Sequence, residues 1–378
     1  MKIPLFKIYW DRSDVASATD SVKRGMFWAA GPNIEKFEKL LSQYLGVKYV
    51  LVFNSGTAAL HSLLMAHGIG KGDEVIVPSF TFIATCNAPL FVGAKPVFAD
   101  IEQARYGLDP KDVEKKITKK TKAIIAVHYG GVPCKIQALK KIAKKYHLLL
   151  IEDAAESFGA KEYGKQVGTF GDCAMFSFCQ TKVFTTGEGG CALTNSKAIF
   201  EKLKLIRSHG RLEDGSYFSS GNYMDYVTLG YNFRMADIVA ALGVSQIKKV
   251  DRLIKKRQEN TKYMNRILSR IEGLIIPTFQ ANIRNVCQEY PVHITEGKKT
   301  RDSLKKYLFS RGIGTRISFA PVHLTHFYKK VLGYNTTLAV TEKISSRALT
   351  LPMYPSLTKK EMDYIAKEIK LFFRKNGQ

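Results

Sequence analysis

The feature that most constrains the fold is an alternation of short apolar runs with segments of helical periodicity. Apolar runs occupy residues 49–53, 74–78, 95–99, 123–127 and 148–151, and segments with helical spacing include 34–44, 110–117 and 136–146. Continuous apolar strands that alternate with amphipathic helices are typical of βαβ units, in which helices cover both faces of a parallel sheet. The sequence therefore predicts an α/β fold with a mainly parallel central sheet flanked by helices.

Polar residues gather where these predicted strands end. Ser55, Gly56 and Thr57 follow the first strand, a loop bearing Phe82 follows the second, and Asp153 ends the run at 148–151. Ligands of parallel sheets bind beyond the carboxyl ends of the strands. The turn at 55–57 leads into a helix, so its free N–H groups and the helix dipole favour an anion such as phosphate. An ordinary helix N-cap explains the same residues.

A predicted hairpin at 173–195 carries an isolated lysine. Its apolar runs, 174–178 and 191–193, flank Lys182 and the glycine-rich turn 187–190. An ammonium group between buried strands is costly to desolvate unless it is paired or neutral. One solution is a covalent bond between Lys182 and an aldehyde cofactor, and the simpler alternative is a solvated lysine on the hairpin loop.

A lysine, a carboxylate at a strand end and a phosphate-binding turn are the groups needed to hold pyridoxal 5′-phosphate. Lys182 would bond to the aldehyde, and Asp153 would keep the pyridine nitrogen protonated. The turn at 55–57 would hold the phosphate, and the Phe82 ring would pack on the cofactor face. A freed Lys182 amine can move a proton between substrate and cofactor carbons, which is the chemistry of transamination.

A series of short motifs runs through the chain in order. They are Gly31-Pro32 with Phe37-Glu38, Asn54-Ser55-Gly56-Thr57-Ala58-Ala59-Leu60, Pro78-Ser79-Phe80-Thr81-Phe82, Glu152-Asp153-Ala154-Ala155-Glu156, Phe176-Ser177-Phe178 with Lys182, the glycine-rich turn 187–190, Gly230-Tyr231-Asn232-Phe233-Arg234-Met235, and Leu351-Pro352-Met353-Tyr354. Together they resemble the DegT/DnrJ/EryC1/StrS family of sugar aminotransferases over essentially the whole chain. The resemblance implies the aspartate aminotransferase architecture (fold type I), and the string at 153–156 is shared with perosamine-synthase-like members.

The resemblance also implies roles for individual residues at the cofactor. Lys182 would be the Schiff-base lysine and Asp153 the partner of the pyridinium nitrogen. Gly56, Thr57 and Ser177 would hold the phosphate, together with the neighbouring hydroxyl at position 55. Related dehydratases of this fold carry histidine in place of the lysine, so the lysine favours transamination.

Five further positions are implied by the same resemblance. Phe82 would stack on the ring, although an ordinary core residue is the alternative. Glu156 stands where many members carry glutamine near the phenolic oxygen of the cofactor. Asn232 would reach the cofactor phosphate of a neighbouring subunit in a homodimer with shared sites, and a helix N-cap is its alternative. Arg316 and His323 resemble positions near the sugar, and each is equally compatible with a structural or surface role.

The length of 378 residues predicts two domains. We place a large α/β domain that binds pyridoxal 5′-phosphate at 1–250 and a smaller α+β domain at 251–378. A long helix that follows 229–243 and runs to about residue 271 would mark their boundary. In the second domain we expect strands at 286–294 and 315–319, helices at 301–311 and 359–372, and a loop at 321–328. The polar segment 212–223 predicts a loop on which substrate choice depends.

Composition restricts the class of protein. The formal net charge is +25, which indicates either an anionic partner or lysines on solvated helix faces. The paired lysines lack interleaved aromatic residues, so a solvated surface is favoured over nucleic-acid binding. The six cysteines lack CxxC spacing, which argues against a zinc site or a disulfide framework. The chain has neither an apolar run long enough to span a membrane nor a recognisable signal peptide, so we expect a cytoplasmic protein.

These observations favour one function. We expect transfer of an amino group from L-glutamate to a nucleotide-linked keto-deoxysugar, with the 4-keto-6-deoxy type favoured, in amino-sugar and polysaccharide biosynthesis. Attraction of the substrate diphosphate would give the basic surface a use. One alternative is the same chemistry on a non-nucleotide keto-sugar or a keto-cyclitol. A more remote alternative is a sensor or nucleic-acid binder of the same fold, for which the charge is the main indication.

Overall fold

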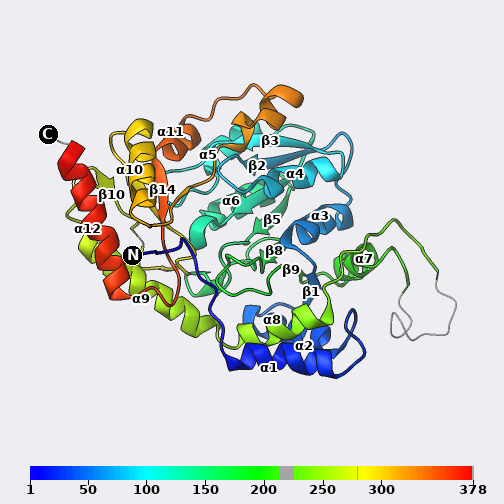
Figure 1. Ribbon diagram of the computed structural model, residues 1–378. Helices are drawn as coiled ribbons and strands as arrows, with labels where there is room; N and C mark the ends of the chain where they lie inside the picture. Colours follow the sequence, from blue (N-terminus) through cyan, green and yellow to red (C-terminus); the bar gives the residue numbers. More distant parts are fainter. Residues whose placement is uncertain (213–224, 279, 377–378) are drawn as a thin grey trace.

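A seven-stranded sheet forms the centre of the molecule (Figure 1). The computed structural model describes residues 1–212, 225–278 and 280–376. In spatial order the strands are β1 (Tyr49–Phe53), β9 (Gly190–Thr194), β8 (Cys173–Ser177), β5 (Leu149–Asp153), β4 (Thr121–Val127), β2 (Glu74–Pro78) and β3 (Lys95–Ala99). Strand β9 is antiparallel to both of its neighbours, and the other adjacent strands are parallel. The predicted α/β class is confirmed, and β8 and β9 form the predicted hairpin.

Helices cover both faces of this sheet. One face packs against α3 (Gly56–Ala66), α4 (Ile83–Phe91) and α7 (Lys197–Arg207). The other face packs against α2 (Pro32–Leu45), α5 (Pro110–Lys116), α6 (Ile136–Lys145) and α8 (Asp237–Ile247). Helix α1 (Arg12–Lys23) packs against α8. Alternate strand residues enter different cores, so Leu51 and Phe53 pack on the α3 side while Val50 and Val52 pack on the α2 side. This two-residue period explains why a continuous apolar run is needed when both faces are buried.

The C-terminal part of the chain builds a second, smaller sheet. Its strand order is β10 (Leu274–Ile275), β12 (Tyr290–Ile294), β14 (Ala348–Leu351) and β13 (Arg316–Ile317). The helices around it are α9 (Val250–Leu268), α10 (Lys298–Ser310), α11 (Ala339–Arg347) and α12 (Lys359–Asn376). Apolar residues from α9, α10, α12 and this sheet form a core of their own, which matches the α+β character predicted for this region. Helix α9 begins at the predicted domain boundary.

Segments from each part of the chain are built into the other part. Near the N-terminus, Ile3 bridges Ile313 and is buried in the core of the small sheet, and Figure 1 shows the N-terminus beside the C-terminal helices. In the opposite direction, Val322, Tyr328 and Leu338 are buried in the core of the large sheet. Val322 lies in a 3-10 turn (Val322–Leu324), Tyr328 lies in a π-helical turn (Phe327–Val331), and Leu338 is the N-cap of α11. A short third sheet also joins β11 (Ile283–Arg284) to β6 (Lys161–Glu162) and β7 (Lys165–Gln166).

The long helix predicted after 229–243 corresponds to α9, but it begins only at Val250 and ends at Leu268. A separate helix, α8, precedes it, and the two are separated at Lys248 and Lys249. The Lys249 ammonium pairs with Asp11 and Asp14 of the N-terminal region, at 2.7 Å from each carboxylate. This tertiary pairing at the break is not visible in the apolar periodicity, which continues across it. Upstream, Asn232 and Arg234 form isolated β-bridges instead of a helix.

Two smaller expectations also differ from the structure, and a third is not tested by it. The strand predicted at 286–294 is limited to β12, because Cys287 adopts a left-handed φ of 51° that turns the chain before the strand begins. The loop predicted at 321–328 contains the two short helical turns named above, and α11 was not predicted. The loop predicted at 212–223 lies, apart from Leu212, outside the described residues.

In the ranges given above, every helix is too short or too polar to cross a bilayer. All six cysteines are free thiols.

Candidate active site

A cavity of about 270 Å³ lies at the carboxyl edge of the large sheet. It is bordered by the residues that follow β1, β2, β4, β5 and β8, which all end at this edge. Of the residues predicted from the sequence, the cavity wall includes Ser55, Gly56, Thr57, Phe82, Asp153, Glu156, Ser177, Lys182 and Arg316. Asn232 and His323 do not line it. The sheet topology therefore brings together groups that are far apart in the sequence.

The turn at 55–57 forms one end of the cavity. Ser55 is the N-cap of α3, and its hydroxyl accepts a hydrogen bond from the Ala58 N–H at 3.1 Å. The N-cap interpretation of Ser55 is thus confirmed, and the same turn lines the cavity. In the described part of the chain, the N–H groups of Gly56 and Thr57 donate to no protein atom. They form a free pair of donors at a helix N-terminus, where an anion is stabilised.

Close packing of backbone holds this turn against the β8–β9 hairpin. A Cβ atom at Gly56 would lie 3.1 Å from the Ser177 Cβ. At Gly190, the first residue of β9, a Cβ would lie only 2.4 Å from the Gly56 nitrogen. Glycine at both positions therefore lets the donors of the turn lie beside the Ser177 hydroxyl, and these groups together match the acceptors of a phosphate.

Asp153 is a buried acid at the opposite side of the site. Its carboxylate accepts hydrogen bonds from the Thr85 hydroxyl at 2.7 Å and from the Ala155 N–H at 3.1 Å. Burial raises the pKa of Asp153, although these hydrogen bonds and the Lys182 charge oppose the effect. Among the described residues, no cation forms an ion pair with this carboxylate. A buried acid that lines a cavity without a cationic partner fits a protonated pyridine nitrogen, which would supply the missing charge.

The Lys182 ammonium lies 3.4 Å from one carboxylate oxygen of Glu156. The second oxygen of Glu156 accepts the N–H of Gly130 at 2.8 Å. Gly130 has a φ of 63°, a left-handed conformation that glycine adopts without strain and that aims its N–H at the acid. Glu156 is therefore held from two sides, and its carboxylate compensates the lysine charge in the cavity wall.

A second buried acid, Glu289, adjoins the site and was not predicted. The Arg316 guanidinium pairs with one of its oxygens, and the Tyr129 hydroxyl donates to the other at 3.2 Å. Burial raises the pKa of Glu289, and the negative charge of Glu156 raises it further. Through this pair, Arg316 is fixed where its side chain reaches the cavity.

Phe82 and Asn232 are both exposed in the single chain. Phe82 is the N-cap of α4 with 61% of its surface accessible, so the core alternative is wrong, and its ring faces Phe319 at 6.4 Å between centroids. The alternative role of Asn232, a helix N-cap, is also wrong, because the N-cap of α8 is Ala236. The Asn232 carbonyl accepts a hydrogen bond from the Asn54 side chain at 3.2 Å. Both residues are thus available on the surface to a second subunit.

His323 is buried, and both of its ring nitrogens have partners. Its Nδ1 atom lies 2.6 Å from the Ser79 hydroxyl, and its Nε2 atom lies 3.3 Å from Glu342. Burial lowers the pKa of His323, and Glu342 opposes this shift. Of the two roles left open by the sequence, the structural one matches these contacts, and the chain does not bring His323 into the cavity.

Thr85, Tyr129, Glu289 and Phe319 are the site residues that sequence reasoning missed. Thr85 lies inside a largely apolar helix and carries no local signal of its role. Glu289 did carry a signal in the sequence, because an acid inside an otherwise apolar segment is a costly residue to bury. Treating 286–294 as one continuous strand concealed it.

Known proteins are similar to this chain in sequence and structure along nearly its whole length. The model of the DegT/DnrJ/EryC1/StrS aminotransferase family matches residues 10–370. GDP-perosamine synthase of Caulobacter vibrioides is 37% identical over 339 residues, which are 89% of each protein. Among solved structures, Helicobacter pylori PseC, an aminotransferase of pseudaminic acid biosynthesis, has a TM-score of 0.93 at 29% identity and covers 99% of this chain and 100% of its own. The PLP form of Spr1654, described as a putative sugar aminotransferase from Streptococcus pneumoniae, has a TM-score of 0.93 at 26% identity, over 99% of both chains.

Proposed function

The chain belongs to the DegT/DnrJ/EryC1/StrS aminotransferase family, and on this premise we propose that it transfers an amino group from L-glutamate to a nucleotide-linked keto-deoxysugar. It is an aminotransferase, and its cofactor is pyridoxal 5′-phosphate. The observation that carries the proposal is the shared cavity of Lys182, Asp153 and the glycine turn at 56. We further propose that the acceptor is of the 4-keto-6-deoxy type. Relatives named GDP-perosamine synthase and the PseC structure support a nucleotide sugar.

When bound, the cofactor supplies an aldehyde that bonds to amines and a ring that accepts electrons from the adjacent carbon. Lys182 would hold it through Nζ, and the same atom, once free, would carry a proton between the two reacting carbons. Asp153 would keep a proton on the ring nitrogen, and the Thr85 hydroxyl orients its carboxylate. The N–H groups of Gly56 and Thr57 would hold the phosphate with the Ser177 hydroxyl.

Glu156 would help to hold the lysine side chain in the cavity. Its carboxylate lies 3.4 Å from Nζ of Lys182, and the Gly130 N–H keeps the acid in place. As Nζ moves toward the cofactor, Glu156 would remain as a nearby acceptor for the proton that the amine gives up. The Phe82 ring would cover the cofactor face and exclude water from it.

The substrates would enter on the side of Arg316. Its guanidinium, fixed by Glu289, is a donor for a carboxylate or phosphate at the edge of the cavity. The net charge of +25 supports an anionic acceptor, because a basic surface raises the local concentration of a diphosphate. We also propose a homodimer in which Asn232 of one subunit reaches the cofactor phosphate of the other, which the exposure of this residue allows.

Replacement of the lysine tests the proposal. Lys182→Ala should abolish both the visible absorbance of the bound cofactor and the transfer of ¹⁵N from labelled glutamate to the sugar. Lys165→Ala, an exposed lysine on β7, should leave both unchanged. The acceptors should be a panel of nucleotide-linked 4-keto and 3-keto sugars beside a free keto-sugar and a keto-cyclitol.

The outcomes of this experiment are distinct. Full transfer by Lys182→Ala would refute the assignment of the lysine. Transfer only to the free keto-sugar or the keto-cyclitol would refute the nucleotide-sugar acceptor while preserving the aminotransferase. A salt-dependent complex with DNA and no turnover of any acceptor would favour the binding protein instead.

A further inference from the structure

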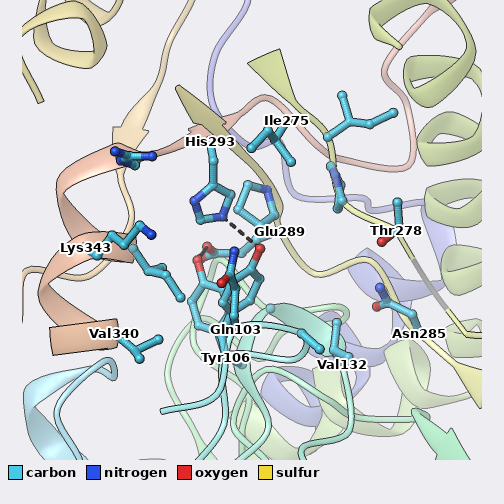
Figure 2. A pocket seen from close by; sticks show the side chains of 18 of the residues that line it. Gln103, Tyr106, Val132, Ile275, Thr278, Asn285, Glu289, His293, Val340 and Lys343 are labelled. Atoms are coloured by element: carbon cyan, nitrogen blue, oxygen red, sulfur yellow. Dashed lines mark hydrogen bonds between the residues drawn. The ribbon is translucent and has the colours of Figure 1, made fainter. Parts of the chain in front are cut away.

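A second cavity, of about 450 Å³, lies between the loops of the large sheet and the small C-terminal sheet (Figure 2). None of the residues that line it lines the first cavity. Figure 2 shows Val340 and Lys343 of α11 on one side and Thr278 and Asn285 on the other. Its volume falls within the range of about 300–1,000 Å³ that is typical of small-molecule sites.

Two aromatic side chains pack against each other in the wall of this cavity. The side chains of Tyr106 and His293 stack with centroids 5.3 Å apart and planes inclined by 24°. The Tyr106 hydroxyl and the His293 Nε2 atom are 2.8 Å apart and hydrogen-bonded, as the dashed line in Figure 2 shows. Tyr106 has a left-handed φ of 59°, an uncommon conformation for a side-chain-bearing residue. The rings are therefore locked in place, and their surface is preorganised for a planar ligand.

Apolar side chains surround the aromatic pair. They come from two elements, with Ile275, Ile276 and Pro277 at β10 and with Val340 and Ile344 on α11. Polar side chains stand between these apolar groups, among them Gln103, Thr278 and Asn285. A wall that combines apolar surface with hydrogen-bonding groups is the usual composition of a small-molecule site.

Two cations complete the wall on α11. Lys343 and Arg347 are four residues apart, so they lie on the same helix face as Val340 and Ile344. Within the described ranges, neither cation forms an ion pair. The acid that lines the cavity, Glu289, is already paired with Arg316. The cavity thus carries uncompensated positive charge beside an aromatic surface.

The histidine in this wall adds no charge near neutral pH. Burial and the positive charge of Arg347 together lower the pKa of His293 to about 4. The imidazole is therefore neutral, and it remains an aromatic partner and a hydrogen-bonding group.

We propose that this cavity binds a planar heterocycle that carries a phosphate group, with a nucleoside monophosphate as the simplest example. The ring would lie against Tyr106 and His293, and the phosphate would pair with Lys343 and Arg347. The ligand would also touch Tyr129 and Gly130, whose other contacts hold Glu289 and Glu156 of the active site. The proposal does not depend on the nature of the amino acceptor.

Calorimetric titration of the holoenzyme with GMP tests this site. A nucleotide can also occupy the active site through its phosphate, so the titration is repeated with the double variant Arg316→Ala/Glu289→Gln. This variant removes the active-site cation together with the acid that it pairs, so the second cavity gains no unpaired negative charge. We expect one GMP per chain to bind with unchanged affinity in this double variant and about tenfold more weakly in Lys343→Ala or Arg347→Ala, because each of the latter loses one charge-assisted contact. Lys360→Ala, an exposed lysine on α12, is the matched control and should bind like the parent chain.

Two further probes separate the ring from the phosphate. Guanosine and ribose 5-phosphate should each bind much more weakly than GMP, because each lacks one half of the recognised group. Absence of GMP binding, equal binding of ribose 5-phosphate, or affinities in Lys343→Ala and Arg347→Ala that equal the parent would each overturn the proposal. Lys343 is exposed, so its replacement leaves the fold intact and keeps the test decisive even if Arg347→Ala is unstable.

Discussion

Replacement of Gly190 by alanine tests the packing that shapes the phosphate end of the active site. The new methyl carbon would lie 2.4 Å from the Gly56 nitrogen and 2.6 Å from its Cα. The optimal van der Waals separation of non-bonded carbon atoms is about 3.5–4.0 Å, so the two backbones must separate by about 1 Å. Both clashing groups are main chain, and no change of rotamer can relieve the contact.

The cost of this separation can be estimated in two ways. Overpacking of a tight site costs about 1–3 kcal/mol, and this corresponds to about a 5–150-fold change in an equilibrium constant. A displacement of about 1 Å at a catalytic constellation can cost about 10²-fold, which falls in the same range. We therefore expect Gly190→Ala to weaken cofactor binding by one to two orders of magnitude, through displacement of the donors at Gly56 and Thr57.

The affinity is measured by titrating the cofactor-free protein with pyridoxal 5′-phosphate and following its absorbance. Gly70→Ala is the matched control, because its methyl carbon would meet only the Val92 carbonyl, at 3.7 Å. Urea unfolding of both variants separates a general loss of stability from a local one. If Gly190→Ala binds the cofactor as tightly as Gly70→Ala does, the turn at 56 does not hold the phosphate.

Two further predictions concern stability. Asp237→Ala should lower the free energy of unfolding by about 3–5 kcal/mol, because the buried carboxylate joins three elements and its loss leaves the Arg24 charge unpaired. Its partners are the Ser21 hydroxyl, the Arg24 guanidinium and the backbone and side chain of Asn33. Urea titration measures this, and Asp20→Ala, an exposed acid on α1, should change stability little. His293→Gln should reduce the decrease in the free energy of unfolding that occurs as the pH is lowered. The pKa of His293 is lowered from 6.5 to about 4, so the unfolded chain binds the extra proton in this interval and stability falls as the pH drops through it. The contribution is at most about 3 kcal/mol, and an unchanged pH profile in His293→Gln would contradict it.

Much of the large sheet could be predicted from the sequence for a specific reason. The strands at Tyr49–Phe53, Glu74–Pro78 and Lys95–Ala99 have the predicted bounds, because each is a five-residue run that must bury both faces and is closed by turn residues. Nine of the eleven residues predicted for the site line the cavity, since a residue just after a parallel strand lies at the ligand-binding edge. Lys182 and Asp153 reached the same cavity for this reason.

The parts that escaped prediction depend on contacts between distant segments. The helix break at Lys249 coincides with ion pairs to Asp11 and Asp14, and the left-handed turn at Cys287 precedes β12. Neither leaves a periodic signal in the sequence. Glu289 differs, because the acid is visible in the sequence, but its burial beside Arg316 arises only when the two parts of the chain meet.

The pairing of Ile3 with Ile313 has a consequence for how the protein is made. Ile3 completes a core whose other members, from Met264 to Phe372, are synthesised about 260 to 370 positions later. Until then Ile3 lacks its partner Ile313, and its apolar side chain is exposed to solvent. Closing so long a loop is slow, so the final docking of the N-terminus is expected to be a late event in folding, and one that a bulky tag fused at this end would delay.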